Sequence, residues 1–276
     1  LRLTDALIGM GNRPGAAGIF RELSRREGIG DAPYYLLRAG ELERKSGDWE
    51  AAVRDFEALL ERFPEAPEVR PATFHLGELY AEHQQFDHAE KLLRRLLADG
   101  AGAGEGRLLF FLGYLNFEQD RFEEAESLFR RALEEKADAN VRRDTLYYLG
   151  GTLLEQDEDE EALEIFAELL ELPEEERPRF SDSLLFRLEA MYFKRDRYGV
   201  SETIARWLLT REDPDVVYRA SLRLARLLII QNRLEDALEV LRPLQERVSQ
   251  APDPDPEAEG EKDMRAEEVA SLLGEV

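Results

Sequence analysis

A small residue recurs along this chain at intervals of 36 to 39 positions, in seven copies. The residue four positions after each copy is mostly large and apolar, and it lies one helical turn along the same face. Seven positions in near-register indicate one structural unit repeated along the chain. The small residues are Ala16, Ala52, Ala89, Ala125, Ala162, Ser201 and Ala237. The residues four positions later are Phe20, Phe56, Leu93, Phe129, Phe166, Ala205 and Leu241.

The clearest copy of the unit spans residues 107–136, RLLFFLGYLNFEQDRFEEAESLFRRALEEK. Both halves carry apolar residues at helical spacing, and a short polar stretch separates them. Small residues at Gly113 and Ala125 let two helices approach where a larger side chain would hold them apart. The segment therefore predicts two amphipathic helices that are joined by a tight turn.

A Leu-Gly pair recurs in the predicted first helices, and proline ends two of the second helices. The pairs are Leu76-Gly77, Leu112-Gly113 and Leu149-Gly150, with weaker copies at Ala39-Gly40 and Leu224-Ala225. With the segment Thr73-x-x-Leu76-Gly77-x-x-Tyr80, these features resemble the tetratricopeptide repeat family over about residues 1–249. The resemblance implies an all-α, right-handed α-solenoid of about seven antiparallel helix pairs. The Phe-Pro-x-x-Pro link at 63–67 also resembles bacterial envelope members of that family.

Three domains are expected from the changes in pattern along the chain. The solenoid covers residues 1–249, an acidic proline-rich linker covers 250–262, and a short C-terminal helix covers 263–276. One repeat departs from the pattern and is expected to pack or bend differently from the others. Its unusual residues are Glu189, Ser201 and Ala205.

The formal charge of the chain is −23, from 37 Lys and Arg residues against 60 Asp and Glu residues. This balance argues against nucleic acid as a partner and against attachment to anionic lipid. No apolar run approaches the roughly 18 residues that cross a bilayer, so direct membrane insertion is not expected. The absence of cysteine fits either a bacterial cytoplasm or a periplasm. Because the chain begins at Leu1 without Met, we expect it to be a segment of a longer protein.

No motif for catalysis is present, so we predict that the chain is not an enzyme and needs no cofactor or metal. His75, Glu78 and Glu82 share a helix face, but their spacing matches no known set of metal ligands. The acidic run 157–161 lies at a predicted turn, where acids favour the start of a helix rather than a calcium loop. The glycine-rich segment 99–106 lacks the strand and the Lys-Ser/Thr of a phosphate-binding loop, and it is predicted to be a linker.

The resemblance further implies that the first helices line a concave ligand surface. Its predicted aromatic contacts are Phe74, Phe110, Tyr114, Phe117, Tyr147, Phe186 and Phe193. Its predicted basic contacts are Arg187, Arg219, Arg223 and Arg226, and Glu41, Glu78 and Glu82 would make the opposite end acidic. Aromatic clusters with a charged rim mark interaction sites. The alternative is that the aromatic rings, Phe111 and Tyr148 above all, belong to the core and the arginines form salt bridges.

The predicted function is therefore a non-catalytic scaffold that binds a peptide or a partner segment in its groove. Two alternatives remain: an assembly subunit of a bacterial envelope complex, with self-association, and a regulatory segment of a larger protein. The acidic tail after Gln250 is tethered beside the arginines, and it is predicted to fold back over that end of the groove.

Overall fold

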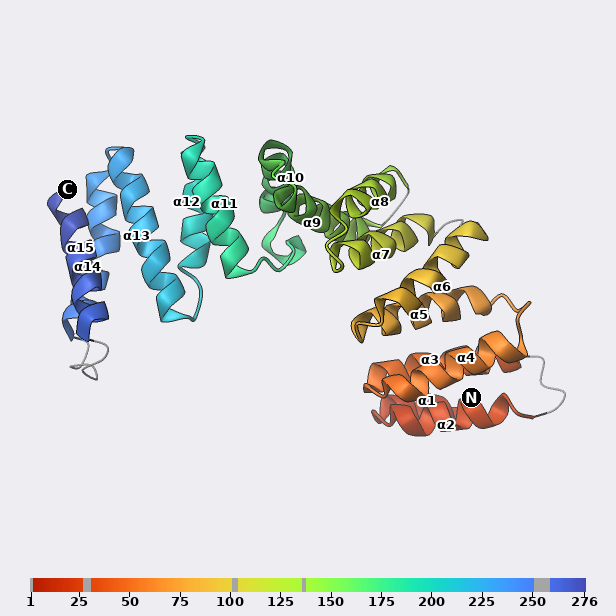
Figure 1. Ribbon diagram of the computed structural model, residues 1–276. Helices are drawn as coiled ribbons and strands as arrows, with labels where there is room; N and C mark the ends of the chain where they lie inside the picture. The colour runs from red at the N-terminus through yellow and green to blue at the C-terminus, as the bar shows by residue number, and fades with distance from the viewer. Residues whose placement is uncertain (1, 27–30, 101–103, 136–137, 251–258) are drawn as a thin grey trace. The chain divides into compact units, whose positions relative to one another are not determined.

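The computed structural model describes residues 2–26, 31–100, 104–135, 138–250 and 259–276, with only the backbone described for residues 2, 247–250 and 259–266. Within these ranges the chain forms fifteen α-helices and no β-strand. Fourteen of the helices are consecutive pairs, which confirms the seven predicted hairpins (Figure 1). The pairs are α1 (Arg2–Gly9) with α2 (Arg13–Leu23), α3 (Ala32–Ser46) with α4 (Trp49–Arg62), α5 (Val69–Glu82) with α6 (Phe86–Ala98), α7 (Glu105–Phe117) with α8 (Phe122–Glu134), α9 (Ala139–Glu155) with α10 (Asp159–Glu171), α11 (Asp182–Lys194) with α12 (Tyr198–Leu208), and α13 (Pro214–Ile230) with α14 (Leu234–Gln250).

The chain forms two compact units. The first unit, Leu1–Leu170, holds helices α1 to α10, and the second unit, Glu171–Val276, holds a short 3-10 helix and α11 to α15. The last helix, α15 (Glu259–Gly274), begins four residues before the predicted start at 263. Most of the predicted linker 250–262 lies outside the described residues. None of the described helices is both long and apolar enough to cross a membrane.

Within four hairpins, a glycine of the first helix lies directly against a large side chain of the second helix. A Cβ atom added at the glycine would come within 2.5 to 2.9 Å of that side chain. The two residues are always 16 positions apart: Gly40 and Phe56, Gly77 and Leu93, Gly113 and Phe129, Gly150 and Phe166. The seven small residues that define the repeat are all fully buried as well. Small residues on both helices therefore set the close approach within each hairpin.

Every hairpin turn contains one residue in the left-handed backbone region, five positions before the small residue of the second helix. These residues are Gly11, Gly47, Gln84, Asp120, Asp157, Asp196 and Asn232, with φ between 57° and 86°. The next amide donates to a carbonyl five residues earlier, for example from Gln85 to Tyr80 at 2.8 Å. This C-terminal cap reverses the chain within two to four residues. The acidic run 157–161 is confirmed as a turn followed by the start of a helix.

The sixth hairpin replaces the glycine and the large residue by Glu189 and Ala205, again 16 positions apart. The Glu189 side chain is only 3% exposed, accepts a hydrogen bond from Ser201 at 2.9 Å, and pairs with Arg223 at 2.5 Å. The sixth hairpin thus has a long buried residue on its first helix and a small one on its second, the reverse of the four glycine pairs. This confirms that the departure predicted at these positions is a difference in packing.

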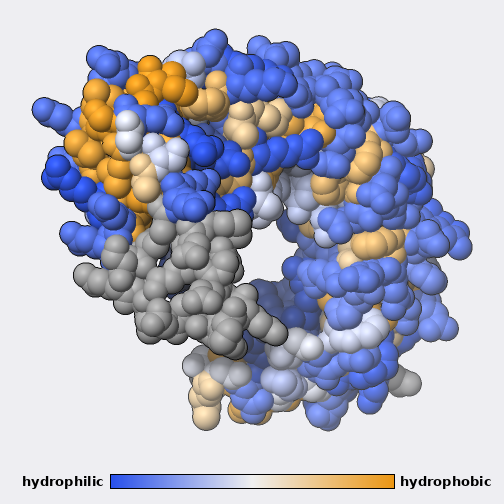
Figure 2. All heavy atoms as spheres, turned by 60° about the vertical axis from the view of Figure 1, so that its left-hand side comes forward, coloured by the Kyte–Doolittle hydropathy of each residue, from blue (hydrophilic) through white to orange (hydrophobic). Residues whose placement is uncertain are grey.

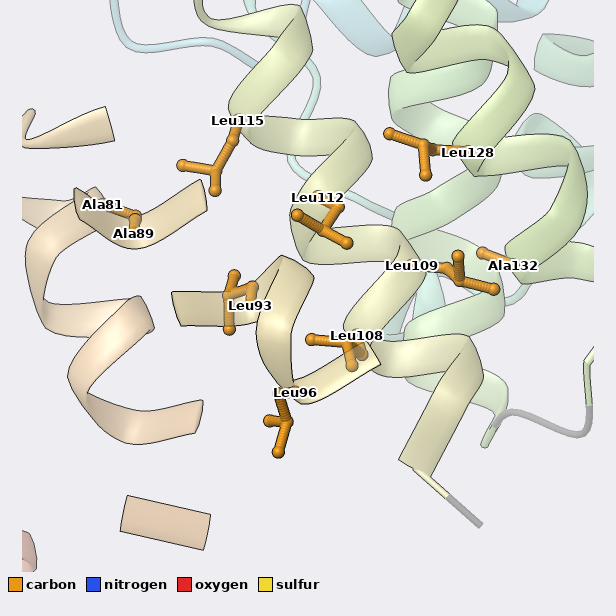
Figure 3. Close-up of a cluster of buried hydrophobic side chains, with 10 residues drawn as sticks. All are labelled: Ala81, Ala89, Leu93, Leu96, Leu108, Leu109, Leu112, Leu115, Leu128 and Ala132. Atoms are coloured by element: carbon orange, nitrogen blue, oxygen red, sulfur yellow. The ribbon is translucent and has the colours of Figure 1, made fainter. Parts of the chain in front are cut away.

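Neighbouring hairpins share leucine-rich layers, which makes the first unit continuous from one hairpin to the next. In Figure 3, Leu93 from α6 faces Leu108 and Leu112 from α7, and Leu128 from α8 closes the other side. All four leucines are at most 6% exposed. Within the first unit, α3, α5 and α7 therefore each pack against the second helix of their own hairpin and against that of the preceding one.

We predict that Gly113→Ala destabilises the protein by about 2 kcal/mol, because the new methyl group overpacks a filled site. Its Cβ would lie 2.6 Å from Phe129 Cε1. Adding Phe129→Leu should recover much of the loss, as Leu93 already packs on Gly77. Urea unfolding followed by circular dichroism measures the free energies.

The matched control is Gly18→Ala in α2, where a Cβ meets nothing within 4 Å. It should raise the stability by up to roughly 1 kcal/mol through helix propensity. Equal effects of Gly18→Ala and Gly113→Ala would contradict the close-approach account.

Candidate peptide-binding surface

Seven aromatic rings from three successive first helices form one connected cluster in the first unit, which we call the aromatic surface. They are Phe74 from α5, Phe110, Phe111, Tyr114 and Phe117 from α7, and Tyr147 and Tyr148 from α9. Phe74, Phe110 and Tyr147 occupy the same repeat position, three residues before the glycine. The repeat period therefore brings them to equivalent places on neighbouring helices.

Tyr148 is the centre of this cluster. Its ring centroid lies 5.2 Å from Tyr114, 5.5 Å from Phe117, 5.9 Å from Phe110 and 5.4 Å from Tyr147. Phe111 joins Phe74 to the cluster, with centroids 5.2 Å and 5.3 Å from Phe74 and Phe110. Most of these pairs are edge-to-face, a favourable arrangement for aromatic rings. All seven rings are partly exposed, including Phe111 and Tyr148, which were the residues expected to be core.

The tyrosine hydroxyls of the aromatic surface stay protonated over the usual pH range. Burial raises the pKa of Tyr114, Tyr147 and Tyr148, and the carboxylates of Glu118 and Glu82 raise that of Tyr114 further. The hydroxyls of Tyr114 and Tyr148 make no side-chain hydrogen bond among the described residues. Both are free to bind a ligand.

Glu78 does not form the open acidic end that the sequence predicted. Its side chain is 4% exposed and accepts hydrogen bonds from Arg44 and from Arg107, the latter at 2.8 Å. The Nδ1 atom of His75 lies 2.9 Å from the same carboxylate. Although burial alone would raise the pKa of Glu78, these three partners lower it. Of the predicted helix-face cluster, Glu78 and His75 thus belong to an ionic network around a buried carboxylate, while Glu82 is exposed outside it. No group of potential metal ligands occurs in the part of the chain that the structure describes.

Arg107 lies against the aromatic surface, and the sequence interpretation did not predict this contact. Its guanidinium lies 4.7 Å from the Phe74 centroid and 5.8 Å from the Phe111 centroid. In the second unit, Arg219 lies 4.2 Å from the Phe186 centroid in the same relation. Both arginines follow their phenylalanine by 33 residues, a spacing that could have revealed the contact.

Of the ligand-contact residues predicted in the second unit, some are buried or paired and others are exposed to solvent. Phe186 is only 5% exposed beneath Arg219 and Arg223, so the expectation that its ring is open to a ligand is corrected. Arg223 is held by Glu189 at 2.5 Å. Arg187 and Arg219 are exposed, while Phe193 is half-buried against Tyr198 at 5.7 Å.

The C-terminal helix α15 packs on the last hairpin through Val269 and Leu272, which are 2% and 3% exposed. Its Glu268 lies 3.6 Å from Arg226 and accepts a hydrogen bond from Tyr218 at 3.3 Å. One acid of the tail therefore reaches the predicted basic contacts. The preceding acidic segment, 251–258, lies outside the described residues, and the rest of the fold-back hypothesis stays a prediction.

Sequence profiles described as tetratricopeptide repeat match residues 1–67, 37–103, 74–140 and 192–252, and a second profile of that description matches 144–174. The chain belongs to the tetratricopeptide repeat family. Among curated proteins the chain has no match.

Solved tetratricopeptide structures are similar to this chain in fold. One from Parabacteroides merdae is 16% identical, with a TM-score of 0.57 over 98% of this chain and 96% of its own. PilF of Pseudomonas aeruginosa is 18% identical, with a TM-score of 0.55 over 89% and 99%. MamA of Desulfovibrio magneticus is 20% identical, with a TM-score of 0.52 over 62% and 91%. These likenesses confirm the predicted all-α solenoid of helix pairs, a fold that generally serves protein–protein interaction.

We predict that Glu78→Gln lowers the free energy of unfolding at pH 7 by roughly 2 kcal/mol, because charged hydrogen bonds are lost. The folded-state pKa of Glu78 is depressed, so its contribution is present above the unfolded value of about 4.3 and disappears as the pH falls through the folded value. The variant and the wild type should therefore converge in stability in acid, as measured by urea unfolding across pH.

The control for this prediction is Glu82→Gln, an exposed acid on the same helix. Its pH dependence should follow that of the wild type. A Glu78→Gln curve parallel to the wild type at every pH would contradict the role of the network.

Proposed function

We propose that this chain captures a segment of a partner protein on the aromatic surface of its first unit, without catalysis. The observation that carries the proposal is the connected cluster of seven partly exposed rings on α5, α7 and α9. Rings of this kind present large apolar area at a small cost in conformational entropy. They are enriched among the residues that carry most of the energy at interfaces.

The surroundings of the cluster support the same proposal. The face drawn in Figure 2 is largely hydrophilic, as expected from a net charge of −23, and its hydrophobic residues gather in a few places, most broadly at the upper left. The rings stand on rigid helices whose spacing is set by the glycine contacts of each hairpin. A binding surface built on such elements is ordered before the ligand arrives, which reduces the cost of binding.

The second unit supplies a separate set of proposed contacts. These are the exposed residues Arg187 and Arg219 and the half-buried ring of Phe193. That a partner also contacts these residues stays a prediction from the sequence. Self-association and an assembly or regulatory role also stay predictions from the sequence.

The experiment is a selection of short random peptides displayed on phage against the whole chain. Enriched peptides should bind the wild type and should bind Tyr114→Ala/Phe117→Ala at least about 30-fold more weakly, since each ring is expected to act as a hot spot. Fluorescence anisotropy of labelled peptides measures the affinities, and circular dichroism checks that the variant keeps its helices.

The control variant is Trp49→Ala, which removes a half-buried aromatic ring from a second helix of the same unit. It should leave the affinities unchanged. The proposal is wrong if no peptide is enriched, or if the enriched peptides bind the Tyr114→Ala/Phe117→Ala variant as tightly as the wild type.

A further inference from the structure

Two exposed carboxylates border the aromatic surface without an ionic partner. Glu82 is the last residue of α5 and Glu118 directly follows α7, so they occupy the same repeat position 36 residues apart. Neither side chain forms an ion pair or a hydrogen bond within the described ranges. Other glutamates of the chain, among them Glu78, Glu90 and Glu161, are held by arginine. Glu82 and Glu118 differ from these glutamates because their carboxylates have no arginine partner among the described residues.

These acids lie beside three rings of the cluster. Glu118 is adjacent to Phe117 in sequence and one turn after Tyr114, whose carbonyl accepts its backbone N–H at 2.9 Å. Tyr148 contacts both rings, at 5.2 Å from Tyr114 and 5.5 Å from Phe117. Glu82 lies at the end of α5, and α5 contacts α7, the helix that holds Tyr114. Burial raises the pKa of the Tyr114 hydroxyl, and the negative charges of Glu118 and Glu82 raise it further.

Aromatic faces beside carboxylates form a favourable environment for a cation. The protein already contains such a contact on this surface. The Arg107 guanidinium lies 4.7 Å from the Phe74 centroid while it donates to Glu78 at 2.8 Å. Tyr114 occupies the repeat position of Glu78 on the next first helix, but no arginine of the chain covers its ring among the described contacts.

We propose that the segment bound on the aromatic surface is basic, and that one of its Lys or Arg side chains lies against Tyr114, Phe117 and Tyr148 and pairs with Glu82 and Glu118. This inference rests on the proposed function and names the chemistry of the partner. The free hydroxyls of Tyr114 and Tyr148 accept hydrogen bonds from the same cation. The net charge of −23 attracts such a segment and repels an acidic one.

The peptide selection on the whole chain tests the inference through the composition of the enriched sequences. Peptides selected on the wild type should contain Lys or Arg well above the library frequency. Peptides selected on Glu82→Gln/Glu118→Gln should lose that excess. The matched control is Glu123→Gln/Glu124→Gln, which makes the same change of charge at exposed positions on α8, the second helix of the same hairpin.

A double-mutant cycle with one selected peptide gives the quantitative result. Replacing its conserved Lys or Arg by Gln should weaken binding to the wild type and to the control variant by about tenfold, and should change binding to Glu82→Gln/Glu118→Gln by less than about twofold. Anisotropy titrations at one fixed salt concentration measure the six affinities of the two peptides for the three proteins.

The outcomes separate this inference from the proposed function. Enriched peptides that are neutral or acidic, yet still require Tyr114 and Phe117, would overturn the inference and leave the function standing. An equal loss from the Lys or Arg substitution on all three proteins would also overturn it. Failure to enrich any peptide would remove both.

Discussion

The contact between a glycine of each first helix and the large residue 16 positions later is the constraint on which the structure depends. With only a hydrogen atom at Gly40, Gly77, Gly113 and Gly150, the side chain of the second helix lies almost against the backbone of the first. The left-handed residue in the turn and the small residue five positions after it complete the same geometry. One short interaction thus fixes the hairpin, and its repetition fixes the spacing of the surface that the first helices present.

The sixth hairpin shows that the constraint is to fill the space between the two helices, and that glycine on the first helix is not the only way to meet it. Glu189 and Ala205 exchange the small and the large partner, and the buried carboxylate is satisfied by Ser201 and Arg223. A buried ion pair of this kind contributes little net stability, but loss of one partner is costly. Arg223 therefore has a structural role in pairing with Glu189, and it is less available to a ligand than its place on a first helix suggests.

The repeat positions, the seven hairpins and the turns could be read from the sequence, because periodicity survives even where individual residues differ. The 39-residue step between Ala162 and Ser201 was also visible, and the boundary between the two units, Leu170 to Glu171, falls inside it. The sequence predicted one solenoid over residues 1–249, because a longer step does not by itself indicate a boundary between two units.

The solvent exposure of individual site residues could not be predicted from the periodicity of the sequence. Phe74, Phe110 and Tyr147 share one repeat position with Phe186, yet only Phe186 is buried. Arg219 covers its ring as Arg107 covers that of Phe74, and Arg223 lies over it as well. Likewise Glu78 is buried because Arg44, His75 and Arg107 converge on it from three helices. Such outcomes depend on long side chains from neighbouring hairpins, and the pattern within one repeat contains no information about them.

The most direct test of the account is to give the sixth hairpin the pair that the others have. Glu189→Gly and Ala205→Phe should each lower the free energy of unfolding by about 2 kcal/mol, through a cavity and through overpacking respectively. If glycine and a large residue 16 positions apart form the unit of packing, the two changes together should fit each other. The free energy of unfolding of the double variant, measured in urea, should then exceed by at least about 2 kcal/mol the value expected from adding the two single losses. Additive losses would contradict the account.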